Sequence, residues 1–362
     1  MITAVGLTRD FTKGKETVHA VRQIDLDVGA GELVALLGPN GAGKSTTLRM
    51  LTTLLPPTSG TAEVAGASIV ADPAEVRRRI GYIGQGNAAG HSFRVLDELV
   101  MQGCFYGMSR RTARLRAQEL VTSLDLVGLE KRGVGTLSGG QRRRLDVAMG
   151  LMHRPRLLFL DEPSTGMDPH NRANLWEHIR RLRAEEGTTI VLTTHYLEEA
   201  DAQAERVLVI DHGRIIANDT AAQLKAELAG DRITVAVSPA LLDRVVALMS
   251  ALGSGVAVED GVRRGDERLV SGRFDHGARL LPRLLHQLDG AGVEVFAAEL
   301  RLPTLDDVFL ALTGRSLRDA EQTDTQQTDT QQTHTGTPDP PDGPGGHPAG
   351  AAPSDVPEGA RP

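Results

Sequence analysis

The chain contains Gly38-Pro39-Asn40-Gly41-Ala42-Gly43-Lys44-Ser45-Thr46, which matches the pattern G-x-x-x-x-G-K-[ST]. The apolar run Leu33–Leu37 precedes it and predicts a buried strand, and residues 44–54 predict a helix. The glycines let the backbone turn its amide groups inward, and the following helix directs its positive end to the same place. We expect the Lys44 ammonium to reach the β- and γ-phosphates of a nucleotide and the Ser45 hydroxyl to bind Mg²⁺.

A second apolar strand ends in two acidic residues. Leu157–Leu160 is followed by Asp161 and Glu162, and buried strands rarely end in paired carboxylates unless a cation lies nearby. We expect Asp161 to contact Mg²⁺ through water and Glu162 to act as the general base that orients the attacking water. The alternative is a strand-end turn capped by Asp161, which leaves the second acid unexplained.

A glycine pair follows a serine at the start of a further predicted helix, in the sequence Leu137-Ser138-Gly139-Gly140-Gln141. Ser138 is a typical N-cap residue, but Gly139 and Gly140 are poor helix formers. The glycines make sense if a phosphate approaches the backbone of that helix terminus. Such a helix cannot reach a phosphate already held by residues 38–46 of the same chain. We therefore expect two copies to face each other head to tail, each closing the nucleotide site of the other.

The phosphate loop, the LSGGQ sequence and the Asp-Glu strand end together resemble the ATPase subunits of ABC transporters, in the order of that family. The resemblance covers about the first 225 residues. It implies ATP and Mg²⁺ as ligands, hydrolysis of ATP to ADP and phosphate, a homodimer, and a separate polytopic membrane permease subunit. It also implies that the loop Gly38–Thr46 of one protomer and Ser138–Gln141 of the other bind the same ATP.

Four further positions are assigned through the resemblance, one at a time. Phe11 resembles the aromatic residue that stacks on adenine, and a core-facing Phe in a hairpin is the alternative. Gln85 resembles the glutamine that contacts Mg²⁺ and water and touches the membrane subunit. Asp168 resembles the residue that links the two ATP sites, and with Pro169 behind it Asp168 is also a good N-cap. His195 resembles the histidine that contacts the γ-phosphate.

These residues follow strands that are expected to share one sheet. The ligands of open α/β sheets bind along the carboxyl edge of the strands, so residues far apart in sequence should meet there. We expect the catalytic residues to be Lys44, Gln85, Glu162 and His195, and the Mg²⁺ ligands to be Ser45, Gln85 and Asp161.

The predicted fold is α/β, in three zones. Residues 1–228 alternate strands and helices, which predicts a P-loop domain with a mostly parallel sheet; the resemblance adds an antiparallel β subdomain and an inserted helical subdomain at about residues 90–150. Residues 229–315 predict the element order of a small α+β ferredoxin-like domain with an accessory or dimerisation role. Residues 316–362, which repeat Thr-Asp-Thr-Gln-Gln at 323–332, predict a disordered acidic tail rich in Pro, Gly, Gln and Thr.

Composition limits the compartment and the partners. No apolar run approaches the ~20 residues that cross a bilayer. Together with the membrane permease that the resemblance implies, this leads us to expect a peripheral protein at the cytoplasmic face of the bacterial cell membrane. The net charge is −7, and residues 316–362 hold eight acids against two arginines, a net of −6. The folded part therefore has no basic field, and we expect no nucleic-acid partner. The single cysteine, Cys104, is expected to be a small buried hydrophobic residue.

Two segments are similar to a narrower group, the daunorubicin-resistance type of drug-export ATPase. They are residues 302–314 and Arg142-Arg143-Arg144-Leu145-Asp146. This resemblance implies efflux of a hydrophobic drug or natural product. The alternatives are an exporter ATPase for lipid or polysaccharide and a soluble ABC ATPase acting on nucleic acid or ribosomes. The first segment also predicts an amphipathic helix whose inward-facing residues are Leu305, Val308, Phe309 and Leu312.

Overall fold

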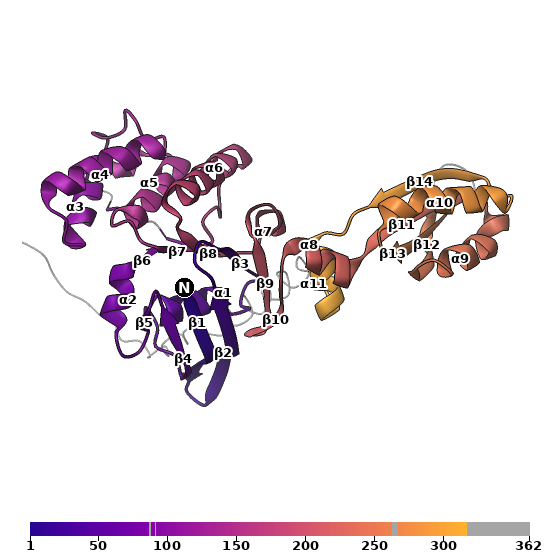
Figure 1. The fold of residues 1–362 in the computed structure, drawn as a ribbon, viewed down its shortest axis with the longest axis horizontal. Helices are drawn as coiled ribbons and strands as arrows, with labels where there is room; N and C mark the ends of the chain where they lie inside the picture. The colour runs from indigo at the N-terminus through magenta and orange to yellow at the C-terminus, as the bar shows by residue number, and fades with distance from the viewer. Residues whose placement is uncertain (87, 91, 263–266, 317–362) are drawn as a thin grey trace, which may run out of the picture. The chain divides into compact units, whose positions relative to one another are not determined.

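The computed structural model describes residues 1–86, 88–90, 92–262 and 267–316. The acidic tail predicted for residues 316–362 lies, apart from Ser316, outside the described residues. The described strands form three sheets, two in a first domain and one in a smaller C-terminal domain (Figure 1). None of the described helices combines the length and the apolar character that a bilayer crossing requires.

The central sheet of the first domain has six strands in the order β10-β9-β3-β8-β7-β6. Only β9 and β10 run antiparallel, and the other neighbours are parallel. Three strands are buried along their whole length, because both faces of the sheet are covered, and this explains their continuous apolar sequences. The predicted mostly parallel sheet is confirmed. The strands are β3 (Leu33–Leu37), β6 (Ile80–Ile83), β7 (Leu157–Asp161), β8 (Thr189–Thr194), β9 (Arg206–Asp211) and β10 (Arg214–Asp219).

Helices cover one face of this sheet. Alternate side chains of the strands, such as Leu158 and Leu192, share a core with helices α3 to α6 (Figure 1). On α6 the residues Leu175, Ile179 and Leu182 are buried, as the helical periodicity predicts. The helices are α3 (Val95–Phe105), α4 (Arg110–Ser123), α5 (Gly139–Leu151) and α6 (Pro169–Glu186), and the short 3₁₀ turn η1 (Val134–Thr136) precedes α5.

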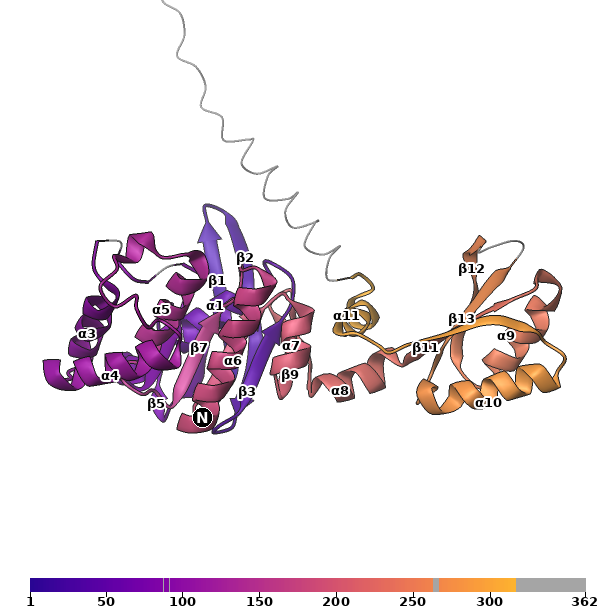
Figure 2. The same ribbon diagram turned by 90° about the horizontal axis from the view of Figure 1, so that it is seen from above.

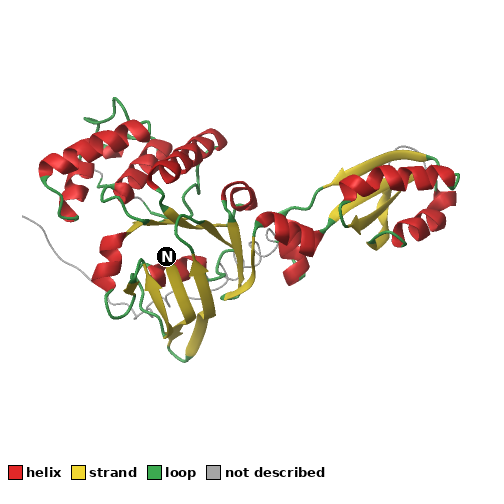
Figure 3. Ribbon diagram, in the orientation of Figure 1, coloured by secondary structure: helices red, strands yellow, loops and turns green. Residues whose placement is uncertain are grey.

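The opposite face packs against α1, α2 and an antiparallel sheet of order β2-β1-β4-β5 (Figure 3). Its core contains the other alternate strand residues, such as Leu36 and Phe159, with Leu48 of α1 and Ile2 of β1. The predicted antiparallel β subdomain is therefore present. Its elements and the adjacent helices are β1 (Ile2–Lys13), β2 (Glu16–Val28), β4 (Ser59–Val64), β5 (Ala67–Ser68), α1 (Lys44–Leu51) and α2 (Pro73–Arg79).

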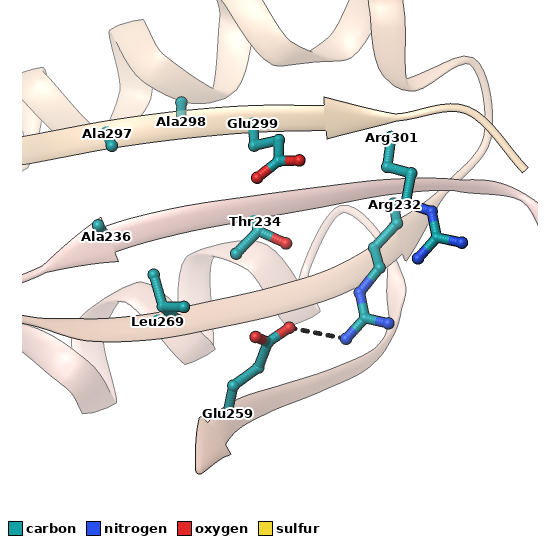
Figure 4. Close-up of a pocket in the computed structure, with 9 residues that line it drawn as sticks. All are labelled: Arg232, Thr234, Ala236, Glu259, Leu269, Ala297, Ala298, Glu299 and Arg301. Carbon is teal, nitrogen blue, oxygen red and sulfur yellow. Dashed lines mark hydrogen bonds and ion pairs between the residues drawn. The ribbon is translucent and has the colours of Figure 1, made fainter. Parts of the chain in front are cut away.

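The C-terminal domain has the predicted ferredoxin-like order, strand, helix, two strands, helix and strand, and its sheet is antiparallel in the order β12-β13-β11-β14. Helices α9 and α10 pack on one face through Val245 and Leu284. The other face has a groove of about 570 Å³, in which Arg232 donates to Glu259 at 2.7 Å (Figure 4). The elements are β11 (Asp231–Val237), η3 (Pro239–Leu241), α9 (Leu242–Ser250), β12 (Ser254–Val262), β13 (Arg268–Phe274), α10 (Gly277–Gly290) and β14 (Val295–Arg301).

After β14 the chain returns to the core of the first domain as helix α11 (Leu305–Thr313; Figure 2). Leu305, Val308 and Phe309 are buried there, and Leu312 is partly buried, as the amphipathic pattern predicts. Their neighbours are α7, α8 and η2, and Arg315 then pairs with Asp211 of β9 at 2.9 Å. The end of the segment assigned to the second domain thus completes the first. The neighbouring elements are α7 (Leu197–Gln203), α8 (Ala221–Leu224) and η2 (Lys225–Ala229).

The prediction that Cys104 is buried is wrong, because its side chain is exposed. The inward position on α3 belongs to the preceding residue, Gly103. A Cβ atom at Gly103 would lie 2.7 Å from the side chain of Ala113, so the helix approaches α4 at the glycine. The cysteine then points to the other side of the helix.

Candidate active site

The phosphate loop connects β3 to α1, and two of its glycines have no room for a side chain. Gly43 has φ of 104°, and a Cβ atom there would lie 2.5 Å from the carbonyl oxygen of Ala20. A Cβ atom at Gly38 would collide with the carbonyl oxygen of Ile210. The Lys44 side chain is buried, and its Nζ donates to the carbonyls of Gly38 at 2.7 Å and Pro39 at 2.8 Å. The ammonium group therefore lies inside the curve of the loop.

The hydroxyl group of Ser45 joins three segments at the carboxyl edge of the sheet. It donates to Oδ1 of Asp161 at 2.8 Å, and Nε2 of Gln85 donates to it at 3.2 Å. Oδ1 of Asp161 also accepts from Oγ1 of Thr193 at 2.7 Å, whereas the buried Oδ2 has no partner within the described residues. Hydroxyl, amide and carboxylate oxygens are the ligands that Mg²⁺ prefers. The unpartnered carboxylate oxygen therefore fits a divalent cation at this place.

Glu162 lies at a left-handed backbone position just beyond β7, with φ of 47°. Its N–H group donates to the carbonyl and hydroxyl oxygens of Thr193, and its Oε2 lies 3.4 Å from Nδ1 of His195. The contact with His195 lowers the pKa of Glu162, against the opposite effect of burial. The carboxylate is consequently ionised at neutral pH, which is the state that a general base needs.

Most of the candidate residues line one or both of two cavities. The first, of about 160 Å³, is lined by the phosphate loop from Asn40 to Thr46 together with Gln85 and Glu162. The second, of about 340 Å³, shares Gln85 and Glu162 with the first but is otherwise lined by residues beyond the phosphate loop, which include Ser138, Gly139, Gly140 and Asp168. A single protomer thus brings the phosphate loop, Gln85, Asp161, Glu162 and His195 together and leaves the Ser138 loop in a different cavity.

Ser138 is the N-cap of α5, as the alternative reading of this residue predicts. Its Oγ accepts from the N–H group of Gln141 at 3.3 Å, and Oε1 of Gln141 accepts from the N–H group of Ser138 at 3.0 Å. A Cβ atom at Gly140 would lie 2.7 Å from Oδ1 of Asn171, while a Cβ atom at Gly139 would meet nothing within 4 Å. Packing against Asn171 therefore gives Gly140 a second reason to be a glycine, whereas the side-chain position of Gly139 is open. Both glycines line the second cavity.

Asp168 and Phe11 have different surroundings. Asp168 is the N-cap of α6, where its Oδ1 accepts from the N–H group of Asn171 at 3.0 Å and Pro169 occupies the first helical position. Phe11 of β1 is 39% exposed, so it does not face the core, and the guanidinium of Arg9 lies 4.8 Å from its ring centroid. The ring is thus available at the surface but does not line the phosphate-loop cavity.

Two residues with roles in the site were not predicted from the sequence. Thr193 forms hydrogen bonds with both acidic residues. Its hydroxyl group donates to the Asp161 carboxylate, and it accepts from the N–H group of Glu162. A threonine at the polar end of an otherwise apolar strand was the available signal. Arg143 is buried on α5 and donates to backbone carbonyls around both Glu162 and Gln85. Three consecutive arginines occur here, and the sequence does not indicate which of them is buried.

Comparisons with known proteins agree with this geometry. A family model described as ABC transporter matches residues 21–165. The daunorubicin resistance ATP-binding protein DrrA2 of Streptomyces coeruleorubidus is 45% identical over 84% of this chain and 93% of its own length. The linearmycin resistance ATP-binding protein LnrL of Bacillus subtilis is 34% identical over 84% and 96%. The dimeric cassette MJ0796, solved in a post-hydrolysis state with ADP and Pi, matches with 25% identity and a TM-score of 0.57, over 61% of this chain and 98% of its own. The chain therefore belongs to the ABC transporter family of ATP-binding, ATP-hydrolysing proteins.

Proposed function

We propose that this chain is the ATP-hydrolysing subunit of an exporter that moves a hydrophobic drug or natural product through a separate polytopic membrane subunit. The convergence of Ser45, Gln85, Asp161, Glu162 and His195 beside the phosphate loop carries the proposal. The cargo class rests on the similarity to the two resistance proteins.

In the proposed mechanism, the amides of residues 38–46 and the Lys44 ammonium bind the phosphates of ATP. In this proposal Lys44, whose Nζ donates to the carbonyls of Gly38 and Pro39, donates to phosphate oxygens when ATP binds. Ser45, Gln85 and Asp161 would hold Mg²⁺, which would supply positive charge to the phosphate oxygens. Oxygen ligands and an unpartnered carboxylate oxygen support this assignment.

Glu162 orients the attacking water and accepts its proton, and His195 contacts the γ-phosphate. The contact between Glu162 and His195 keeps the carboxylate ionised. The turn at Glu162 is fixed by two hydrogen bonds to Thr193, so contacts within the chain hold the base in place. Such pre-organisation is what general base catalysis requires.

A second copy of the chain completes each site. Ser138, Gly139, Gly140 and Gln141 of one protomer contact the triphosphate bound by the other, and Asp168 lies between the two sites. The separate cavity at Ser138 and the open space at Gly139 support this arrangement, as does the similarity to a dimeric cassette. Phe11 stacks on adenine in this proposal, because its ring is exposed. ATP favours closure of the homodimer only to the extent that it binds the closed state more tightly than the open state.

The proposed place of the dimer is the cytoplasmic face of the cell membrane, bound to its permease subunit. Export of another cargo is the second candidate, because the Nod factor export ATP-binding protein I of Sinorhizobium fredii is 36% identical over 83% of this chain. Nothing in the site distinguishes the two cargoes, since the cargo pathway lies in the membrane subunit.

To test the proposed export function, the chain is expressed with its membrane partner in a drug-sensitive bacterium. We expect the wild-type pair to reduce accumulation of a fluorescent anthracycline, and Glu162→Gln to abolish the effect. The same substitution should slow phosphate release ~10²–10⁴-fold while ATP still binds. Wild-type turnover in Glu162→Gln would show that the assigned base is wrong, and hydrolysis without any change in accumulation would reject the drug as cargo.

A further inference from the structure

A buried arginine lies on α5, the signature helix that begins in the LSGGQ sequence. It binds the backbone of two catalytic loops, which are residues 161–163 around Glu162 and residues 84–85 with Gln85. Arg143 is 8% exposed and forms no salt bridge within the described part of the chain. Its Nε donates to the carbonyl of Pro163 at 2.7 Å, and its Nη1 donates to that of Gly84 at 2.7 Å. Its Nη2 lies 3.3 Å and 3.4 Å from the carbonyls of Asp161 and Glu162. A single guanidinium therefore satisfies four carbonyls from two segments.

Three of these carbonyls belong to the turn that directs Glu162 into the site. A left-handed backbone conformation at a non-glycine residue is unfavourable and persists only where its surroundings fix it. At Glu162 the N–H side of the turn is held by Thr193 and the C=O side by Arg143. The direction of the Glu162 side chain thus depends on the guanidinium.

The fourth carbonyl belongs to Gly84, which directly precedes Gln85. One turn further along α5, Oδ1 of the buried Asp146 accepts from the N–H groups of Ala88 at 3.0 Å and Ala89 at 3.3 Å. The same helix therefore holds the chain on both sides of Gln85. The N-terminus of this helix is the Ser138 loop, which in the proposed function meets the ATP of the second protomer.

We propose that Arg143 is a positioning residue. It couples the positions of Glu162 and Gln85 to the position of helix α5 through its hydrogen bonds to the backbone of both loops. Burying a charge is costly. The four carbonyls, with the nearby negative charges of Asp146 and Asp161, offset that cost only while the helix and both loops keep their present arrangement. When a second protomer shifts the N-terminus of α5, the rigid helix carries the movement to the base and to Gln85. This inference rests on the proposed function, because it assigns no chemistry to Arg143 itself.

The test compares Arg143→Gln and Arg143→Lys with Arg142→Gln in the full-length protein. Arg142 is the neighbouring cation on α5, and its Nη2 donates to Val134 and Gly135, outside both catalytic loops. We expect both Arg143 variants to lower kcat about 10²-fold, because a displaced base loses that much rate, with an unchanged Kd for ATP. Lysine has one donor centre and cannot reach four carbonyls, so the charge alone should not restore the rate. Arg142→Gln should stay within about twofold of wild type.

A combined variant separates positioning from general damage to the fold. If Arg143 acts through Glu162 and Gln85, adding Arg143→Lys to a variant that carries both Glu162→Gln and Gln85→Ala should leave the residual rate within about twofold of that variant's own rate. A further large fall, or a folded Arg143→Lys protein with wild-type kcat, would overturn the proposal. An inactive wild-type protein would instead contradict the proposed function, so the two failures are distinguishable.

Discussion

The hydroxyl group of Ser45, at the start of α1, donates a hydrogen bond of 2.8 Å to Oδ1 of Asp161, which ends β7. This bond joins the phosphate loop to the acidic strand end across 116 residues of sequence. Because β3 and β7 are both parallel to β8, which lies between them, their carboxyl ends lie at the same edge of the sheet. The topology therefore places the two proposed Mg²⁺ ligands side by side.

Asp161→Asn tests the proposed cation site. The amide keeps a hydrogen-bond acceptor for Ser45 but removes the negative charge, so we expect the Mg²⁺ concentration for half-maximal hydrolysis to rise about 10- to 100-fold. The measurement is a Mg²⁺ titration of phosphate release at saturating ATP. An unchanged titration curve would show that Asp161 is not a Mg²⁺ ligand.

The Glu162–His195 contact predicts the pH dependence of hydrolysis. This contact lowers the pKa of Glu162 below its ordinary value of 4.5, and the base is active when ionised. The wild-type rate should therefore not fall through protonation of Glu162 until the pH drops below that value. In His195→Ala the largest cause of the lowered pKa of Glu162 is gone and burial raises the pKa against the smaller effects of Lys44 and Thr165, so the acid limb should move to higher pH. Single-turnover rates, each scaled to the plateau of its variant, measure the shift, and coincident acid limbs would contradict it.

Gly139 and Gly140 should respond differently to alanine. Gly140→Ala crowds Asn171, so we expect the free energy of unfolding to fall by about 1–3 kcal/mol and to recover when Asn171→Ala is added. Gly139→Ala meets open space, and stability should stay within about 0.5 kcal/mol of wild type. Its hydrolysis should nevertheless fall about tenfold or more, because the new methyl group displaces donors near the γ-phosphate. Urea unfolding followed by the fluorescence of the single tryptophan, Trp176, measures stability.

Glu32 should make stability depend on pH. It accepts from Nε and Nη2 of Arg206 at 2.6 Å and 3.0 Å, and these bonds lower its pKa in the folded state. A lowered folded-state pKa gives stability that is complete at neutral pH and is lost as the pH falls through that pKa. We expect Glu32→Gln to cost about 1 kcal/mol at pH 7 and less at pH 3. Glu16→Gln on exposed β2 is the control, and an equal cost at both pH values would argue against the ion pair.

Sequence patterns predicted the parallel sheet, because buried strands and the phosphate loop have local signatures. They could not show that Gly140 also packs closely against Asn171, since that neighbour belongs to another helix. Helical periodicity also predicted the buried face of α11. It could not predict that this face packs in the core of the first domain and not in that of the C-terminal domain. The role of Arg143 depends on backbone carbonyls, which every residue carries and which therefore leave no trace in the sequence.

The composite site is tested most directly by mixing two inactive variants. Lys44→Ala disables the phosphate loop, and Gly139→Asp places a negative charge where the second protomer's triphosphate is expected. A heterodimer of the two has one site with neither defect, whereas each variant alone forms homodimers in which both sites are defective. We predict that the mixture regains roughly a quarter of wild-type turnover, since half the dimers are heterodimers with one intact site of two. No recovery in that mixture, with heterodimers demonstrably formed, would contradict the account.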